Sequence, residues 1–387
     1  MRGKKWDIFC RVVDNFGDIG ICWRLARQLA AEHGLEVRLW VDDLASFHCL
    51  CPDIDPDPIL AMQMLHGVVV RRWDTPFRIA AGAEKSILPD VVVEAFACEL
   101  PEAYLAAMAS RQEKPAWINL EYLSAEHWVG SCHGLASPHP RLPLTKHFFF
   151  PGFVSGSGGL LRETALLRQR AAWQADAVAT WQQLGLPSLS PEETAVSLFC
   201  YDNPALPDLL NSWIAGRSPM RCLIPEGLAL AQAVNCLQTA PLHAGERLRQ
   251  GNLTVYALPF SSQENYDRLL WSCDFNFVRG EDSFVRAQWA ARPFVWHIYP
   301  QEDAAHHAKL DAFLALYCAG LPQPTAEACR NFWHAWNRVG KDNAAKAWAD
   351  YWQHRAELSA HAKKWAAQLA EPVDIASRLV DFCENLL

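Results

Sequence analysis

The chain has 387 residues, which is enough for two domains with full hydrophobic cores. Its 35 basic side chains are outnumbered by 43 acidic ones and form no Lys- or Arg-rich run, so the charge pattern argues against a nucleic-acid partner. No segment reaches the roughly 18 uninterrupted apolar residues of a membrane span, and the charged start is unlike a signal peptide, so we expect a cytoplasmic protein without a membrane partner.

The first half of the chain alternates apolar, strand-like runs with helical or loop segments. The predicted strands cover residues 8–13, 37–41, 68–73, 91–96, 116–122 and 147–150. Several are continuous apolar runs, as expected of strands buried on both faces of a parallel sheet. This rhythm is typical of βαβ units and predicts an N-terminal Rossmann-like domain over residues 1–155.

The turn after the first strand carries two carboxylates and two glycines: Asp14, Gly17, Asp18 and Gly20. The glycines would let the backbone approach a ligand, and the start of the following helix offers unpaired N–H groups to an anion. The two acids do not suit a diphosphate alone and favour a cationic or proton-bearing substrate. An Asx-turn and a helix cap would explain the same acids structurally.

Glycines and serines between residues 151 and 161 predict a hinge, which we place at 156–161. A long helical stretch is predicted over roughly 162–184, followed by strands at 195–201, 220–224, 253–258, 275–278 and 294–298. These segments form a second Rossmann-like domain, 162–370, which would face the first across a ligand cleft. The chain is helical from 302 onward, with Trp333, Trp336, Trp348 and Trp352 packing between helices. Pro372 breaks this helical stretch near residue 370, and the helix of the terminal segment, 371–387, could pack back on the N-terminal domain.

Residues 273–289 repeat the order of strand, turn and helix. Arg279 could pair with phosphate oxygens, and Gly280 permits close approach of a ligand. Ser283 is placed to cap the helix, and the N–H groups after Asp282 could hold anionic oxygens. A capped helix with Arg279 bridged to an acid is the structural alternative.

Aromatic and amide side chains occur at two other strand ends of the same half: Phe199, Tyr201, Phe260 and Gln263. Aromatic faces and an amide would suit a pyrimidine ring, through stacking and hydrogen bonds to its edge. Each residue alone is weak support, because most Phe residues at strand ends belong to the core.

Four segments, VVDNFGDIG (12–20), SLFCYDN (197–203), LPFSSQ (258–263) and VRGEDSFVRAQW (278–289), together closely resemble the EarP family. The resemblance covers essentially the whole chain. It implies an α/β protein of the GT-B fold that transfers L-rhamnose, with inversion, from dTDP-β-L-rhamnose to a loop-tip arginine of elongation factor P. In the family, that modification activates the factor for the rescue of ribosomes stalled at polyproline.

The resemblance also assigns roles to residues of this chain. The matching essential acids are Asp14, Asp18 and Glu281, with Asp18 as the expected general base. The positions that match the donor site are Gly17, Phe199, Tyr201, Phe260, Gln263, Arg279, Glu281, Asp282 and Ser283. The role of a further aromatic, Tyr266, is less certain. No metal ligand and no cofactor is expected, because no D-x-D motif stands at a strand end in this half.

The chemistry of arginine fits these acids. Its guanidinium is cationic at neutral pH, so attack on an anomeric carbon requires that the charge be localised and a proton removed. One carboxylate could bind the guanidinium as a fork while the other takes the proton. Arg279 and helical N–H groups could stabilise the departing dTDP.

Other readings of the sequence remain open. Glu121 and Tyr122 follow a strand end and could line the acceptor side, and His133 or His139 could contact substrate. An NAD-dependent oxidoreductase is a second candidate function, although the first turn has G-x-x-G rather than G-x-G-x-x-G. A non-catalytic module that binds a translation factor is the third. The thirteen cysteines include no C-x-x-C pair, and we expect reduced core thiols.

Overall fold

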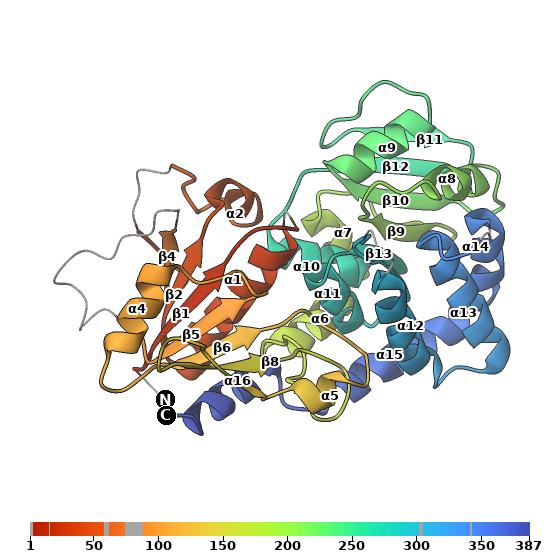
Figure 1. The fold of residues 1–387 in the computed structure, drawn as a ribbon. Helices are drawn as coiled ribbons and strands as arrows, with labels where there is room; N and C mark the ends of the chain where they lie inside the picture. The colour runs from red at the N-terminus through yellow and green to blue at the C-terminus, as the bar shows by residue number, and fades with distance from the viewer. Residues whose placement is uncertain (1–2, 15, 58–61, 74–87, 302–304, 341–342) are drawn as a thin grey trace. The chain divides into compact units, whose positions relative to one another are not determined.

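The computed structural model describes residues 3–14, 16–57, 62–73, 88–301, 305–340 and 343–387 (Figure 1). It divides into two compact units, Met1–Thr164 with Pro372–Leu387, and Ala165–Glu371. The unit boundaries thus fall after Thr164 and Glu371, whereas the sequence predicts a hinge at 156–161 and a boundary at 370. Residue 15 of the first acidic turn and residues 302–304 of the predicted helical region lie outside the described residues.

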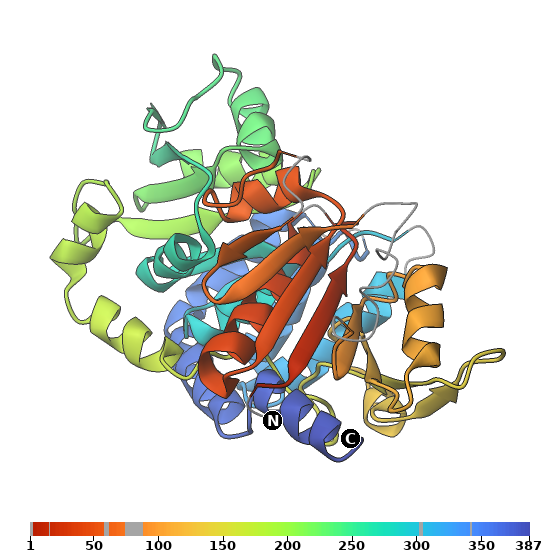
Figure 2. The same ribbon diagram turned by 90° about the vertical axis from the view of Figure 1, so that its left-hand side faces the viewer.

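The first unit is built on an eight-stranded sheet in the order β3-β4-β2-β1-β5-β6-β8-β7, whose strands are seen side by side in Figure 2. Its strands are β1 (Lys5–Cys10), β2 (Glu36–Val41), β3 (Gln63–Leu65), β4 (Val68–Arg72), β5 (Val91–Ala95), β6 (Ala116–Leu120), β7 (Ala136–Pro138) and β8 (Thr145–Phe149). The short edge strands β3 and β7 pair antiparallel with their neighbours, and the other pairs are parallel.

Two separate cores cover the faces of this sheet. One joins the strands to α1 (Gly17–His33), α2 (Leu44–Leu50) and α16 (Ile375–Glu384). The other joins them to α4 (Glu102–Ser110) around Phe9, whose ring stacks on Trp40 at 5.5 Å and meets Tyr104 edge-on at 4.7 Å. A short helix, α5 (Val129–Cys132), lies between β6 and β7 in the chain.

Helix α16 completes the first unit from the far end of the sequence. Its side chains Ile375, Leu379 and Cys383 are buried in the same core as α1. Asp374 caps this helix and also accepts a hydrogen bond of 3.0 Å from Nε2 of the buried Gln28 on α1. The terminal helix therefore packs on the N-terminal sheet.

The second unit has a six-stranded sheet in the order β11-β12-β10-β9-β13-β14. Its strands are β9 (Thr194–Leu198), β10 (Met220–Pro225), β11 (Arg247–Gln250), β12 (Leu253–Leu258), β13 (Phe275–Arg279) and β14 (Phe294–His297). Its helices are α6 (Leu166–Gln174), α7 (Ala177–Gln183), α8 (Leu206–Ile214), α9 (Leu228–Cys236), α10 (Gln263–Ser272), α11 (Asp282–Trp289), α12 (Ala305–Cys318), α13 (Gln323–Trp336), α14 (Ala344–Gln353) and α15 (Arg355–Ala370). Strand β11 pairs antiparallel with β12, and the other pairs are parallel.

Aromatic side chains fix the helices on one face of the second sheet. Phe275 and Phe277 of β13 are fully buried and contact Trp348 of α14 at 5.1 Å and Trp336 of α13 at 4.8 Å. Trp213 of α8 reaches Phe277 at 5.9 Å. The predicted packing role is thereby confirmed for Trp336 and Trp348, whereas Trp352 stacks on Trp348 of its own helix at 5.0 Å.

The predicted helical stretch over 162–184 is present as two helices, α6 and α7. They are separated by Asp176, whose carboxylate accepts the backbone N–H of Ala179 and so begins the second helix. The first strand ends at Cys10 rather than at residue 13, and Val13 is 68 % exposed.

The thirteen cysteines, all within the described residues, are free thiols, and all but Cys49, Cys132 and Cys236 are buried. Among the helices of the described residues, none has the length and apolar character needed to cross a membrane.

Candidate active site

Asp18 organises the acidic turn after β1. It lies in the first turn of α1 and is 2 % exposed, and its Oδ2 accepts hydrogen bonds of 2.9 Å from the backbone N–H groups of both Val13 and Asp14. Burial raises the pKa of Asp18, and the neighbouring charge of Asp14 raises it further, against the effect of the two backbone hydrogen bonds. One carboxylate thus fixes the turn and is more basic than an exposed aspartate.

The lack of a side chain at Gly17 leaves room for the carboxylate of the second acid, Asp14. The N–H of Gly17 donates to the carbonyl of Asp14 at 2.7 Å, and a Cβ at position 17 would lie only 2.7 Å from Oδ2 of Asp14. A larger residue would therefore displace this carboxylate. The local reason for a glycine here is the space that the Asp14 carboxylate occupies.

Tyr122 reaches Asp18 from the end of β6, which is separated from β1 by β5. It follows β6, its side chain is hydrogen-bonded to Asp18, and its ring stacks on Phe96 at 4.6 Å with an interplanar angle of 18°. Tyr122 is 40 % exposed. Phe96 and Ala97 follow β5 with φ of 56° and 51°, a backbone conformation that is uncommon outside glycine and concentrates at functional sites.

These residues meet because β1, β5 and β6 are parallel neighbours that end at one edge of the sheet. Sequence reasoning singled out Tyr122 but missed Phe96, although its place directly after a buried strand was a usable signal. Glu121 instead accepts from Nδ2 of Asn119, and burial raises its pKa.

The two histidines considered as substrate contacts, His133 and His139, have structural roles. Nδ1 of His133 accepts the backbone N–H of Phe150 at 3.0 Å, and Nδ1 of His139 accepts that of Leu142 at 3.0 Å. Each ring therefore holds a loop of the first unit in place.

The turn between β13 and α11 is fixed by its own hydrogen bonds. Gly280 has a φ of 60°, which favours glycine, and its carbonyl accepts Nε1 of Trp296 at 2.8 Å. The Ser283 hydroxyl accepts the N–H of Arg279 at 3.1 Å and donates to the carbonyl of the same residue. The prediction that Ser283 caps the helix is wrong, because its hydroxyl turns back to the Arg279 peptide and Glu281 occupies the N-cap position.

Arg279 is held between two aromatic rings. Its guanidinium carbon lies 4.5 Å from the ring centre of Phe199 and 4.6 Å from that of Tyr201, and the side chain is 8 % exposed. Both aromatics follow β9, the strand beside β13. The stacking presets the direction of the guanidinium in a partly dehydrated environment.

Gln263 connects the remaining predicted donor residues. It begins α10, is 3 % exposed, and its Nε2 donates to Oδ2 of Asp282 at 3.2 Å. Phe260 lies half-buried in the loop that precedes this helix. The Tyr266 ring contacts Phe199 at 5.8 Å. The ends of β9, β12 and β13 thus bring the predicted donor-site residues of the second unit to one edge of its sheet, whereas Gly17 belongs to the first unit.

Two residues of this edge were missed by sequence reasoning. His297 pairs with Arg279 in the β13–β14 register, and its ring lies 5.4 Å from that of Tyr201. Burial, together with the charge of Arg279, lowers the pKa of His297 to about 3, so the ring is neutral. Lys309 of α12 donates to Oε1 of Glu281 at 2.6 Å. The place of His297 at a strand end was a usable signal, whereas no local pattern marks Lys309.

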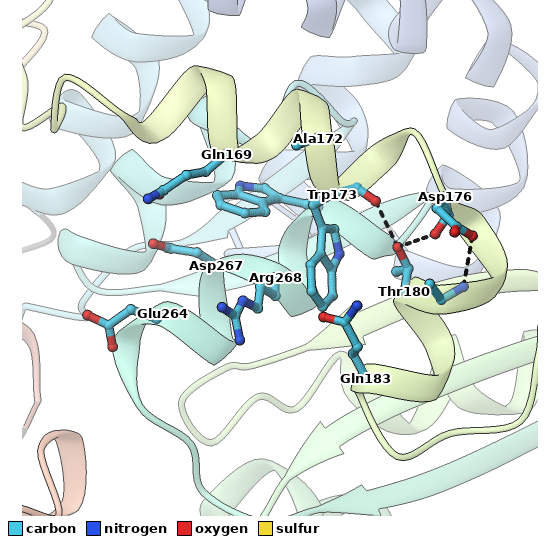
Figure 3. A pocket seen from close by; sticks show the side chains of 11 residues that line it. Gln169, Ala172, Trp173, Asp176, Thr180, Gln183, Glu264, Asp267 and Arg268 are labelled. Atoms are coloured by element: carbon cyan, nitrogen blue, oxygen red, sulfur yellow. Dashed lines mark hydrogen bonds between the residues drawn. The ribbon is translucent and has the colours of Figure 1, made fainter.

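The second unit also has a cavity of about 400 Å³ between α6, α7 and α10, with Trp173 and Arg268 in its wall (Figure 3). None of the predicted site residues lines it. Within the described residues, no group of three or more His, Cys, Asp or Glu side chains is arranged to hold a metal ion.

The comparisons with known proteins agree across the whole chain. The family described as "Elongation-Factor P (EF-P) rhamnosyltransferase EarP" matches residues 6–384. A protein-arginine rhamnosyltransferase of Pseudomonas aeruginosa is 52% identical over 387 residues, covering 99% of this chain and 100% of the relative. A solved structure described as the structural basis for EarP-mediated arginine glycosylation of translation elongation factor EF-P is 39% identical, with a TM-score of 0.70 and coverage of 99% and 100%.

A more distant likeness concerns the fold alone. MurG of Acinetobacter baumannii matches with a TM-score of 0.54 at 14% identity, over 99% of both chains. The two α/β units are those of a GT-B glycosyltransferase, as the sequence predicts. Identity above one half along the full chain and a family match from β1 to α16 lead to one conclusion: this chain belongs to the EarP family of protein-arginine rhamnosyltransferases.

Proposed function

We propose that this protein transfers L-rhamnose from dTDP-β-L-rhamnose to a loop-tip arginine of translation elongation factor P, with inversion and without a metal ion or cofactor. The observation that carries the proposal is the buried Asp18 carboxylate, made more basic by its surroundings and set beside Asp14 and Tyr122. The family and the names of its relatives support the same donor sugar and acceptor side chain. A translation factor as the acceptor implies that the reaction takes place in the cytoplasm.

The acidic edge of the first unit suits a guanidinium. Asp14 would bind the cation as a fork, and the exposed face of the Tyr122–Phe96 stack would attract its plane. As a guanidinium nitrogen attacks the anomeric carbon, Asp18 would accept the proton that this nitrogen loses. The basic character of Asp18 and its fixed position serve that step.

The aromatic edge of the second unit suits a nucleoside diphosphate. Phe199, Tyr201 and Phe260 would contact thymine and sugar, and Gln263 would bond to a polar edge of the ligand. The bond from the anomeric carbon to the diphosphate oxygen breaks as the new bond to nitrogen forms, and the charge passes to dTDP. Arg279 and the N–H groups at the start of α11 would stabilise that charge, a role that many transferases give to a metal.

The experiment that tests the proposal is the intact mass of elongation factor P after incubation with this protein and dTDP-β-L-rhamnose. A gain of one deoxyhexose on an arginine is the expected result. Replacing the donor with dTDP-glucose or NAD provides the control for specificity. An unmodified factor that still binds the protein would favour a non-catalytic binding module, and binding of NAD rather than dTDP would favour the oxidoreductase. In cells, loss of the protein should slow synthesis through polyproline stretches.

A further inference from the structure

Glu281 stands at the N-cap position of α11, yet its carboxylate makes no capping hydrogen bond to that helix. It accepts a hydrogen bond of 2.6 Å from Nζ of Lys309 on α12. The side chains of the two residues are 13 % and 23 % exposed, respectively. A half-sheltered pair at this distance is screened less by solvent than an ion pair on the open surface.

Aromatic packing holds Lys309 at this position. Phe313, one helical turn later on α12, meets Phe284 of α11 edge-on at 4.7 Å, and both rings are 1 % exposed. Phe284 also stacks at 4.0 Å on Trp296, whose indole nitrogen donates to the carbonyl of Gly280. The ion pair and the turn from Arg279 to Ser283 therefore share one rigid support.

The pair has an electrostatic consequence for an anionic ligand. The turn offers Arg279 and helical N–H groups to a diphosphate, but Glu281 places a negative charge in the same turn. An uncompensated carboxylate near two phosphates would oppose binding, and more strongly in a partly dehydrated site than in water. The ammonium of Lys309 offsets this charge and fixes the direction of one carboxylate oxygen.

We propose that Lys309 is a positioning residue of the donor site, which neutralises and orients Glu281 so that an anionic nucleoside-diphosphate sugar can bind beside it. The inference rests on the proposed function for the identity of the donor. Lys309 itself acts through Glu281 and not by contact with the phosphates. This distinction makes the proposal testable with substitutions at both positions.

Calorimetric binding of dTDP to the full-length protein is the measurement. Lys309→Met should weaken dTDP binding roughly tenfold, because the uncompensated charge of Glu281 then opposes the two phosphates. The double variant Lys309→Met with Glu281→Gln should bind dTDP more tightly than Lys309→Met alone, because the uncompensated carboxylate of Glu281 is then gone. Lys309→Arg should keep most of the affinity. Lys363→Met, the same change at an exposed position of α15, is the matched control and should bind as the wild type does.

Two results would overturn the proposal. Equal weakness of the single Lys309→Met and the double variant would mean that Lys309 contacts the phosphates directly, and unchanged binding by Lys309→Met would mean that the ion pair has no role. Should Lys309→Met melt at a lower temperature than the wild type, the double variant decides, because it lacks the same ammonium: dTDP binding no tighter than that of Lys309→Met overturns the proposal. A wild-type protein that binds no dTDP and modifies no factor would instead contradict the proposed function.

Discussion

Replacing Asp18 with asparagine should separate catalysis from folding. Asparagine keeps the size of the side chain and one oxygen that can accept the N–H groups of Val13 and Asp14, so the turn should persist. It cannot take a proton from a guanidinium. Losing a general base lowers the rate by about 100- to 10,000-fold. Binding of dTDP should be nearly unchanged, because the predicted donor residues other than Gly17 belong to the second unit.

The stability of the same variant has a defined pH dependence. Because the pKa of Asp18 is raised in the folded state, the folded protein binds this proton more tightly than the unfolded chain does. The resulting stabilisation is complete below the ordinary pKa of an aspartate and is lost as the pH rises through the raised value. Asp18→Asn has no such loss, so its stability relative to the wild type should increase with pH. Activity should fall at every pH.

Asp18→Ala provides the structural comparison. It removes the acceptor of two backbone hydrogen bonds, which contribute about 1 kcal/mol each, or about 2 kcal/mol together. A unit of this size should then melt at roughly 4–8 °C lower temperature. Transfer is measured by intact mass over time, and stability by thermal melts at about pH 5 and about pH 8. Transfer by Asp18→Asn within about threefold of the wild-type rate would refute the role of Asp18 as the base, and falling relative stability at the higher pH would refute the burial argument.

Four further predictions concern the acidic turn of the first unit, the donor site of the second unit, the metal requirement and the acceptor. Gly17→Ala should lower the transfer rate about tenfold or more, because the new methyl group displaces the Asp14 carboxylate. Its melting temperature should stay near that of the wild type, because only the flexible end of a side chain has to move. The double variant Gly17→Ala with Asp14→Ala should be no less active than Asp14→Ala alone. Arg279→Ala and Phe260→Ala should each weaken dTDP binding in calorimetry, through lost charge pairing and lost stacking respectively; normal binding by both variants would mean that the donor site lies elsewhere. Transfer should continue in excess EDTA, and loss of activity that magnesium or manganese restores would contradict a metal-free mechanism. Intact elongation factor P should have a far higher kcat/KM than a linear peptide of its arginine loop, since docking of the folded factor positions the guanidinium; equal values would indicate recognition of local sequence alone.

Strands that are buried on both faces could be predicted from the sequence because they consist almost entirely of apolar residues. β5 and β6 are fully buried and apolar except for Glu94 and Asn119, and the strand predicted over residues 253–258 has the bounds of β12 in the structure. The edge strands β3, β7 and β11 have three or four residues and are largely exposed, so no apolar run marks them. Their pairing follows from neighbouring strands that are already in place.

In the candidate site, too, local features could be predicted from the sequence, whereas contacts between distant segments could not. Residues within one strand–turn–helix segment, such as Asp14, Asp18 and Arg279, could be found from local motifs. The helix break at Asp176 could not, because a capping side chain competes with helix propensity by a margin that the sequence does not reveal. Lys309 reaches Glu281 across 28 positions of the chain, and its place depends on the contact between Phe313 and Phe284. Contacts of this kind are properties of helix packing.

The return of α16 to the first unit has a consequence for how the chain folds during synthesis. The core that Ile375, Leu379 and Cys383 complete stays open until the ribosome has made residues 165–371. At bacterial elongation rates this delay is about ten to forty seconds, long compared with the folding time of a single domain. The second unit is contiguous and can fold first, so the nascent first unit presents an apolar surface that a chaperone could cover. Removing residues 372–387 should accordingly cause aggregation through the first unit, while the second unit retains its own cooperative unfolding transition.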